Sequence, residues 1–223
     1  MLKTIWPFNK QQPKLPDFWL EYEAECNKPL PTDINKSRFV VLDTETTGFD
    51  FKLDKILSIG AVEVVKNQIN ISNAFEIFIK QNRFNKQTVQ IHGIIKNERF
   101  ETYNEDEAIQ HFLKYIKGAI IVAHHAQFDI TMINKMLNSH KLPKLKNRVL
   151  DTVHLYKATL PKSHLAFQNN DVSLDKIAEN YRLDVCDRHT AAGDALITAL
   201  VFLKTTTQLV SKKGLSLTQL LKL

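Results

Sequence analysis

The chain has few cysteines and no long hydrophobic run, and each of these shortages argues against a class of protein. Its two cysteines, Cys26 and Cys186, make no evident disulfide framework or zinc knuckle, which fits a reducing compartment. No apolar run is long enough to cross a bilayer, so we expect no membrane association. The first ten residues lack the apolar region of a secretory signal. We therefore expect a cytoplasmic globular protein.

Proline is scarce after residue 31, because five of the seven prolines lie within residues 1–31. This change in composition leads us to expect an N-terminal extension at 1–37, a catalytic domain at 38–206 and a C-terminal tail at 207–223. An apolar cluster in the extension predicts a short helix packed on the domain, with a partner-binding segment as the alternative. The cluster consists of Phe18, Trp19, Leu20 and Tyr22.

The net charge of +6 is modest, but lysines and arginines gather between residues 141 and 162 against one acid, Asp151. Such a stretch can hold phosphates, and a solvated surface loop explains it equally well. Asp151 follows the strand-like residues 148–150, and we expect it to have a structural role.

The first acidic motif, at residues 40–48, places two carboxylates after an apolar run. Residues 39–42 predict a strand buried on both faces, and Asp43 and Glu45 then share one face because side chains two apart on a strand point the same way. The turn-forming residues 46–48 put the pair at the carboxyl end of the strand, where α/β sheets carry ligands. A solvated strand end is the alternative.

The second motif, at residues 123–129, follows another short buried strand. Asp129 is expected in the first turn of a helix, where a favourable charge at the helix N-terminus is the competing explanation. His124 and His125 precede it, but no thiolate or further histidine stands at zinc-ligand spacing, so the pattern does not favour zinc.

The third motif, at residues 188–195, contains His189 and Asp194. Five residues separate them, which is about 140° around an α-helix, so they do not share a face. We expect His189 at the entrance of a helix and Asp194 within its early turns. An imidazole there can take a proton from a water molecule, although an ordinary helix-entry histidine is the alternative.

The four carboxylates of these motifs have no evident cationic partner nearby in sequence. Such a group requires cations, and carboxylate oxygens suit hard divalent ions. Two such ions about 3.5–4 Å apart can stabilise the attacking and leaving oxygens of a phosphoryl displacement. The chemistry indicated is cleavage of a phosphodiester.

The three motifs in this order resemble those of the DEDDh (DnaQ-like) 3′–5′ exonucleases, over about residues 38–206. The resemblance implies that Asp43, Glu45, Asp129 and Asp194 hold two Mg²⁺ or Mn²⁺ ions and that His189 is the general base. It also implies a set of residues that bind the terminal nucleotide. These are Thr44, Thr46, Ile91, His92 and His124.

One position departs from the pattern, because His125 stands where many relatives have asparagine. This substitution leaves the expected metal ligands in place. It changes the contacts expected near the scissile phosphate.

The resemblance implies a ribonuclease H-like α/β fold, with a mixed central sheet flanked by helices. The order of elements agrees, since three successive strands are followed by alternating helices and strands. We expect strands at 38–43, 56–65, 68–79, 120–124 and 148–152, and helices at 105–117, 128–139, 172–180 and 190–205.

The implied activity is a metal-dependent 3′–5′ exonuclease that releases nucleoside 5′-monophosphates. The expected partner is nucleic acid with a free 3′ end, above all single-stranded DNA, and a DNA polymerase subunit is a further candidate. A 3′–5′ exoribonuclease would use the same five residues. A non-catalytic polymerase or repair scaffold is the third alternative.

Overall fold

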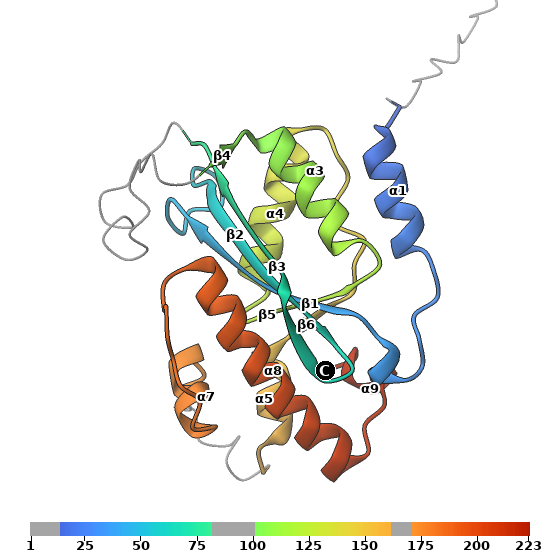
Figure 1. Cartoon of the computed structure of the whole chain (residues 1–223), viewed down its shortest axis with the longest axis vertical. Coiled ribbons are helices and arrows are strands. Elements are labelled where there is room, and N and C mark those ends of the chain that lie inside the picture. The colour runs from blue at the N-terminus through green and yellow to red at the C-terminus, as the bar shows by residue number, and fades with distance from the viewer. Residues whose placement is uncertain (1–13, 82–100, 162–170) are drawn as a thin grey trace, which may run out of the picture.

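The computed structural model describes residues 14–81, 101–161 and 171–223, and its middle layer is a six-stranded mixed sheet (Figure 1). The strand order is β4-β3-β2-β1-β5-β6. β1, β2 and β3 form an antiparallel meander, whereas β5 pairs in parallel with both β1 and β6. The strands are β1 (Phe39–Thr46), β2 (Ile56–Val65), β3 (Gln68–Ile79), β4 (Thr102–Tyr103), β5 (Ile120–Ala123) and β6 (Val149–Asp151).

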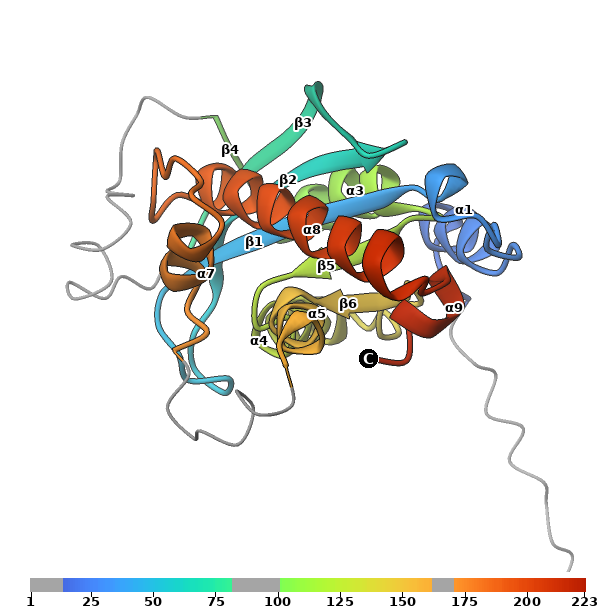
Figure 2. The ribbon, with the colours of Figure 1, turned by 90° about the horizontal axis from the view of Figure 1, so that it is seen from below.

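Helices cover both faces of the sheet (Figure 2). One face carries α1 (Asp17–Cys26), α3 (Glu105–Ile116) and α4 (Gln127–Ser139). The other carries α5 (Thr152–Thr159), α8 (Ala191–Lys213) and α9 (Leu217–Leu220), and α7 (Leu174–Asn180) packs against α8. A short 3-10 helix, Ile34–Lys36, precedes β1. This arrangement is the ribonuclease H-like α/β fold that the motifs imply.

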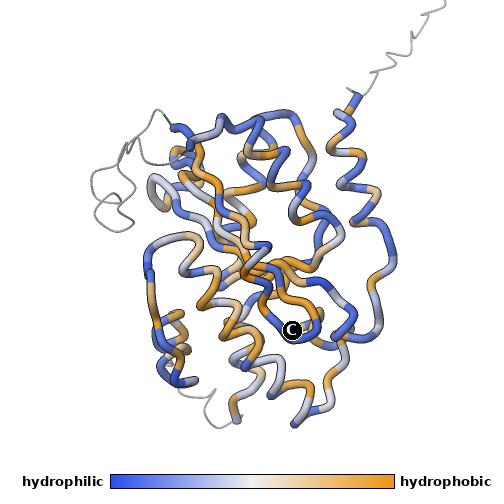
Figure 3. The backbone as a smooth tube through the Cα atoms, in the orientation of Figure 1, coloured by the Kyte–Doolittle hydropathy of each residue, from blue (hydrophilic) through white to orange (hydrophobic). Residues whose placement is uncertain are grey.

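β1 lies inside the sheet because its first four side chains are apolar and buried on both faces. Phe39 and Val41 pack in the core on the α8 side, whereas Val40 and Leu42 pack in the core on the α3 and α4 side. Hydrophobic residues are concentrated along the central strands in Figure 3. The alternation determines which helix each polar side chain farther along β1 can reach.

Most of the predicted elements are present, and the differences have local causes. β1 continues to Thr46 because Glu45 pairs with Ser58 of β2. α8 continues to Lys213 because its later turns still bury side chains such as Leu209, and it ends at Gly214 in a left-handed conformation. The sequence analysis did not identify β4, α5 or α9.

The helix predicted in the N-terminal extension is confirmed. α1 packs beside α3 (Figure 1). The side chains of Trp19 and Tyr22 on α1 are fully buried. The Tyr22 hydroxyl donates a hydrogen bond to Asn147 Oδ1 (2.5 Å) and accepts one from the Lys146 N–H (2.8 Å). Both apolar and polar contacts therefore hold α1 against α3 and the segment before β6.

The first part of the basic stretch, residues 141–148, lies away from Asp43. Residues 141–148 lead into the amino end of β6, and Asp43 lies toward the carboxyl end of β1, which runs in the same direction. The basic side chains of residues 141–148 therefore lie near the ends of the strands opposite to the end that carries Asp43. No helix in the part of the chain that the structure describes is long and apolar enough to span a membrane.

Replacement of Trp19 tests how much the docking of α1 contributes to stability. Trp19→Ala should lower the free energy of unfolding by about 3–5 kcal/mol, because it removes a fully buried indole. Leu20→Ala is the matched control, since Leu20 lies on the same helix and is 44% exposed. Urea unfolding followed by circular dichroism measures both. Equal losses in the two variants would show that α1 is not part of the cooperative core.

Candidate active site

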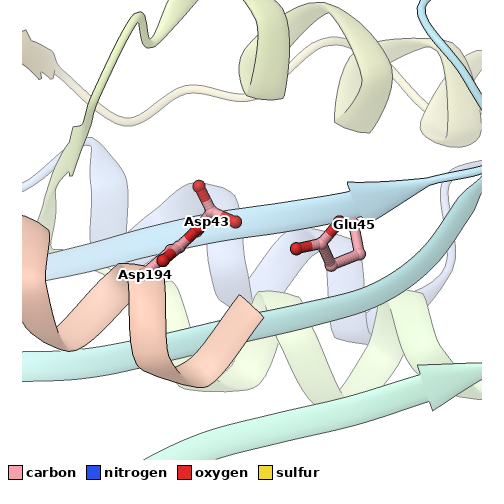
Figure 4. A group of neighbouring side chains, drawn as sticks. All are labelled: Asp43, Glu45 and Asp194. Atoms are coloured by element: carbon pink, nitrogen blue, oxygen red, sulfur yellow. The ribbon is translucent and has the colours of Figure 1, made fainter. Parts of the chain in front are cut away.

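Three carboxylates from two elements meet where α8 crosses β1 (Figure 4). Asp43 and Glu45 lie on the face of β1 that faces α8, in the same alternation as Phe39 and Val41. Asp194 lies in the first turn of α8. One oxygen from each of the three groups lies within 4.8 Å of the others. Carboxylates of the first and third motifs therefore lie together in the fold.

A glycine in β2 permits this meeting. Gly60 stands opposite Asp43 in the β1–β2 pairing, and a Cβ atom there would collide with the backbone of Ala191 and Ala192. Only a residue without a side chain lets the start of α8 lie this close to the sheet. The role of Gly60 was not predicted, although a lone glycine within a strand pattern is itself a signal of close backbone approach.

Two carboxylates of the cluster, Asp43 and Glu45, have raised pKa values. Burial raises the pKa of Asp43 well above its ordinary value, and the charges of Asp129, Asp194 and Glu45 raise it further. Burial and the charge of Asp194 raise the pKa of Glu45 to about 7. The cluster therefore resists full ionisation, which a bound cation would relieve.

Arg188 supplies a cationic partner that the sequence analysis did not expect. Its guanidinium forms an ion pair with Asp194 and also binds Asp175, in the first turn of α7. The expectation that the carboxylates have no cationic partner nearby in sequence is therefore wrong. The signal in the sequence is Arg188 itself, six positions before Asp194. The long side chain of Arg188 reaches from the preceding turn to the first turn of α8.

Asp129 approaches β1 from the opposite face. It is buried in the first turn of α4, as predicted, and its Oδ1 accepts a hydrogen bond from Thr44 Oγ1 (2.7 Å). Thr44 alternates with Asp43 and Glu45 along β1 and so faces α4. Asp129 does not belong to the close group of three, but it is near enough for its charge to raise the pKa of Asp43.

His189 lies in an exposed turn immediately before α8, as predicted, with a left-handed φ of 63°. The Thr190 hydroxyl stabilises this turn by donating to the Asp187 carbonyl (2.8 Å) and accepting from the Gly193 N–H (3.0 Å). A Cβ atom at Gly193 would collide with the Asp187 carbonyl oxygen. The backbone that carries His189 is thus held while its ring stays accessible.

The structure describes three of the five expected nucleotide-binding residues. Thr44 is buried with its hydroxyl on Asp129, and Thr46 donates to the Gly48 carbonyl (2.7 Å). His124 Nδ1 lies 2.8 Å from Thr152 Oγ1, and burial together with the charge of the neighbouring His125 lowers the pKa of His124 to about 4. Ile91 and His92 lie outside the described residues.

His125, which stands where many relatives have asparagine, has a left-handed φ of 56°. Asparagine and histidine both tolerate this region better than most residues do, which explains why either can stand there. Asp151 supports the turn, because its carboxylate accepts from the N–H groups of His125, Ala126 and Val153. Asp151 therefore has a structural role, as expected.

The donor set fits a divalent cation. Asp43, Glu45 and Asp194 offer only carboxylate oxygens, which are the ligands that Mg²⁺ and Mn²⁺ prefer. Burial is the largest cause of the raised pKa values of Asp43 and Glu45, and neighbouring carboxylates raise both further, so a cation bound there would stabilise the ionised groups.

Comparison with known proteins gives concordant results. The exonuclease family model, RNase_T, matches residues 40–202. DNA polymerase III subunit epsilon of Buchnera aphidicola is 35% identical over 173 residues, which cover 74% of this chain and 69% of that protein. A PolC-type DNA polymerase III of Caldanaerobacter subterraneus is 34% identical over 76% of this chain but only 12% of its own length.

The fold is shared with E. coli exonuclease I, solved in complex with a dT13 oligonucleotide. The two structures align with a TM-score of 0.65 at 16% identity. The alignment covers 80% of this chain and 43% of exonuclease I.

The crowding of carboxylates predicts that removing one charge stabilises the metal-free protein. An acid with a raised pKa in the folded state contributes stability that is complete below its unfolded pKa and is lost as the pH rises through its folded pKa. At pH 8 in EDTA, Asp43→Asn should therefore raise the melting temperature by about 2–8 °C, since about 1 kcal/mol corresponds to 2–4 °C in a chain of this size.

The same variant should lose most of the thermal stabilisation that Mn²⁺ gives the wild-type protein, because one ligand is gone. Asp184→Asn is the control, since Asp184 is exposed. Thermal scans with EDTA and with Mn²⁺ measure both effects. A lower melting temperature for Asp43→Asn in EDTA would contradict the electrostatic account.

Proposed function

The chain belongs to the DnaQ-like family of 3′–5′ exonucleases, and from this membership we propose that it removes nucleoside 5′-monophosphates from DNA 3′ ends through the site on β1, α4 and α8. The observation that carries the proposal is the meeting of Asp43, Glu45 and Asp194 at one point, from segments about 150 residues apart in the chain. Family members use divalent metal ions, and the cluster offers suitable ligands.

Each acidic residue has a distinct position in the proposed site. Asp43 lies between Asp194 on the α8 side and Asp129 on the α4 side, so it is placed to share two ions, Mg²⁺ or Mn²⁺. Glu45 and Asp194 would complete the ligands of one ion, and Asp129 would support the other. When bound, the ions would neutralise negative charge on the scissile phosphate and lower the pKa of the attacking water.

His189 is the proposed general base. Its ring is exposed on the turn before α8, so an attacking water and the scissile phosphate can approach it. The turn is fixed through Thr190 and Gly193, which limits the positions that the imidazole can adopt. The residue takes the proton from water and need not bind a metal ion.

DNA is the proposed substrate, supported by the DNA polymerase III relatives and by the oligonucleotide complex of the structural neighbour. By the same analogy, a DNA polymerase subunit is the proposed protein partner. The chain spans only part of these relatives, so substrate and partner both remain proposals for the whole protein. A 3′–5′ exoribonuclease uses the same carboxylates and is the second candidate.

Parallel digestion tests the proposed activity. With Mg²⁺ or Mn²⁺, a 5′-labelled DNA strand should shorten stepwise, and a labelled RNA of the same sequence should shorten more slowly. EDTA and Asp43→Ala should each abolish the reaction, because Asp43 is assigned to both ions. A terminal 3′-phosphorothioate should slow it, and a circular strand should stay intact. Internal cleavage of the circle would indicate an endonuclease, and faster digestion of RNA would favour the exoribonuclease.

Replacement of His189 separates proton transfer from metal binding. His189→Ala should lower kcat by roughly 10²–10⁴-fold, the usual range for loss of a general base. Its affinity for Mn²⁺ in calorimetry should match the wild type, since all four carboxylates remain. His154→Ala, at an exposed histidine on α5, should leave kcat unchanged. Much weaker Mn²⁺ binding by a folded His189→Ala would instead make His189 a ligand.

A further inference from the structure

Arg188 lies between two carboxylates that belong to different helices. Its Nε and Nη2 atoms donate to Oδ1 and Oδ2 of Asp175, at 2.6 and 3.0 Å, in a two-pronged contact. Its Nη1 atom forms the ion pair with Oδ1 of Asp194. The guanidinium thus joins an acid of α7 to an acid of the carboxylate cluster.

The two ends of this bridge differ in exposure. The Asp194 side chain is 11% exposed and the Asp175 side chain is 60% exposed, with Arg188 between them at 21%. Water screens charge poorly at the buried Asp194 end of the bridge. A cation there therefore interacts more strongly with Asp194 than a cation at the surface would. A divalent ion bound by Asp194 would repel the guanidinium at that same end.

The backbone around Arg188 does not depend on the bridge. Thr190 holds the turn through hydrogen bonds with the Asp187 carbonyl and the Gly193 N–H, and neither bond involves the Arg188 side chain. The Arg188 side chain can therefore leave Asp194 by rotating about its own bonds, while the turn that carries His189 stays in place. Because Nε, Nη1 and Nη2 belong to one rigid guanidinium plane, Arg188 keeps the two-pronged contact only if the exposed Asp175 side chain moves with it.

We propose that Arg188 is a positioning residue that acts as the internal counter-ion of the metal site. It neutralises Asp194 while no divalent ion is bound, and it yields Asp194 to the ion while staying paired with Asp175. This inference rests on the proposed role of Asp194 as a metal ligand. It assigns Asp175, outside the carboxylate cluster, a role in setting metal affinity.

A purely structural bridge between α7 and the start of α8 makes a different prediction. Breaking a structural bridge at either end would lower stability without altering metal affinity. A competing counter-ion gives effects of opposite sign at its two ends. Loss of Arg188 removes the group that competes with the metal ion for Asp194, so metal affinity should rise. Loss of the Asp175 charge leaves Arg188 with Asp194 as its remaining partner, so Arg188 competes more strongly and metal affinity should fall.

Calorimetric titration of the full chain with Mn²⁺, without nucleic acid, tests the inference. Arg188→Gln should bind Mn²⁺ about 3–10-fold more tightly than the wild type, and Asp175→Asn about 3–10-fold more weakly, as expected for a partly screened ion pair. In EDTA, Arg188→Gln should also melt at a lower temperature, because Asp194 loses its partner. Glu179→Gln is the matched control, since it removes one charge from α7 but its partner is Lys176.

The outcomes separate this inference from the proposed function. If Arg188→Gln and Asp175→Asn both bind Mn²⁺ within about two-fold of the wild type, while Asp43→Asn abolishes binding, the counter-ion role is wrong and the metal site stands. If the wild type binds no Mn²⁺, both fail. An equal effect of Asp175→Asn and Glu179→Gln would overturn the role of Asp175. Because Asp175 is largely exposed, its variant tests the inference even if Arg188→Gln does not fold.

Discussion

The close approach of α8 to the sheet at Gly60 is the contact on which the site depends. Asp194 can lie beside Asp43 only because the backbone at Ala191 rests on β2 where no side chain intervenes. The same packing positions the start of α8, which the turn with His189 immediately precedes. A second close approach, between Gly193 and the Asp187 carbonyl, folds that turn back onto the first turn of α8. Two glycines thus define where the helix begins relative to the strand.

The alternation of side chains along β1 divides the site between two helices. Asp43 and Glu45 face α8, whereas Thr44 faces α4 and there holds Asp129. Asp129 and Asp194 approach β1 from opposite faces, so both can lie near Asp43 without colliding with each other. The strongly raised pKa of Asp43 is the electrostatic result of burial and of neighbours on both sides.

Concentrating carboxylates in this way opposes folding, and the surrounding structure offsets the effect. Apolar cores lie on both faces of the sheet, and α1 extends one of them through Trp19. Local contacts then hold the polar groups in place, with Asp151 accepting three backbone N–H groups behind the second motif and Arg188 pairing with Asp194. A functional site that is unfavourable for folding and is balanced elsewhere is a common arrangement in enzymes.

The sequence by itself determined the family through its three acidic motifs. It also determined the strands at 56–65 and 68–79 and the elements that carry His189, Asp129 and Asp194. These elements were predictable because hydrophobic periodicity and helix-entry signals act over a few residues. The sequence also predicted that Asp43 and Glu45 share a face. Only the tertiary structure decided that Asp194 joins them while Asp129 comes from the other side, that Arg188 reaches Asp194, and that Gly60 makes room for α8. These features depend on contacts between segments far apart in the chain, and no local pattern specifies which distant backbone will lie against a given residue.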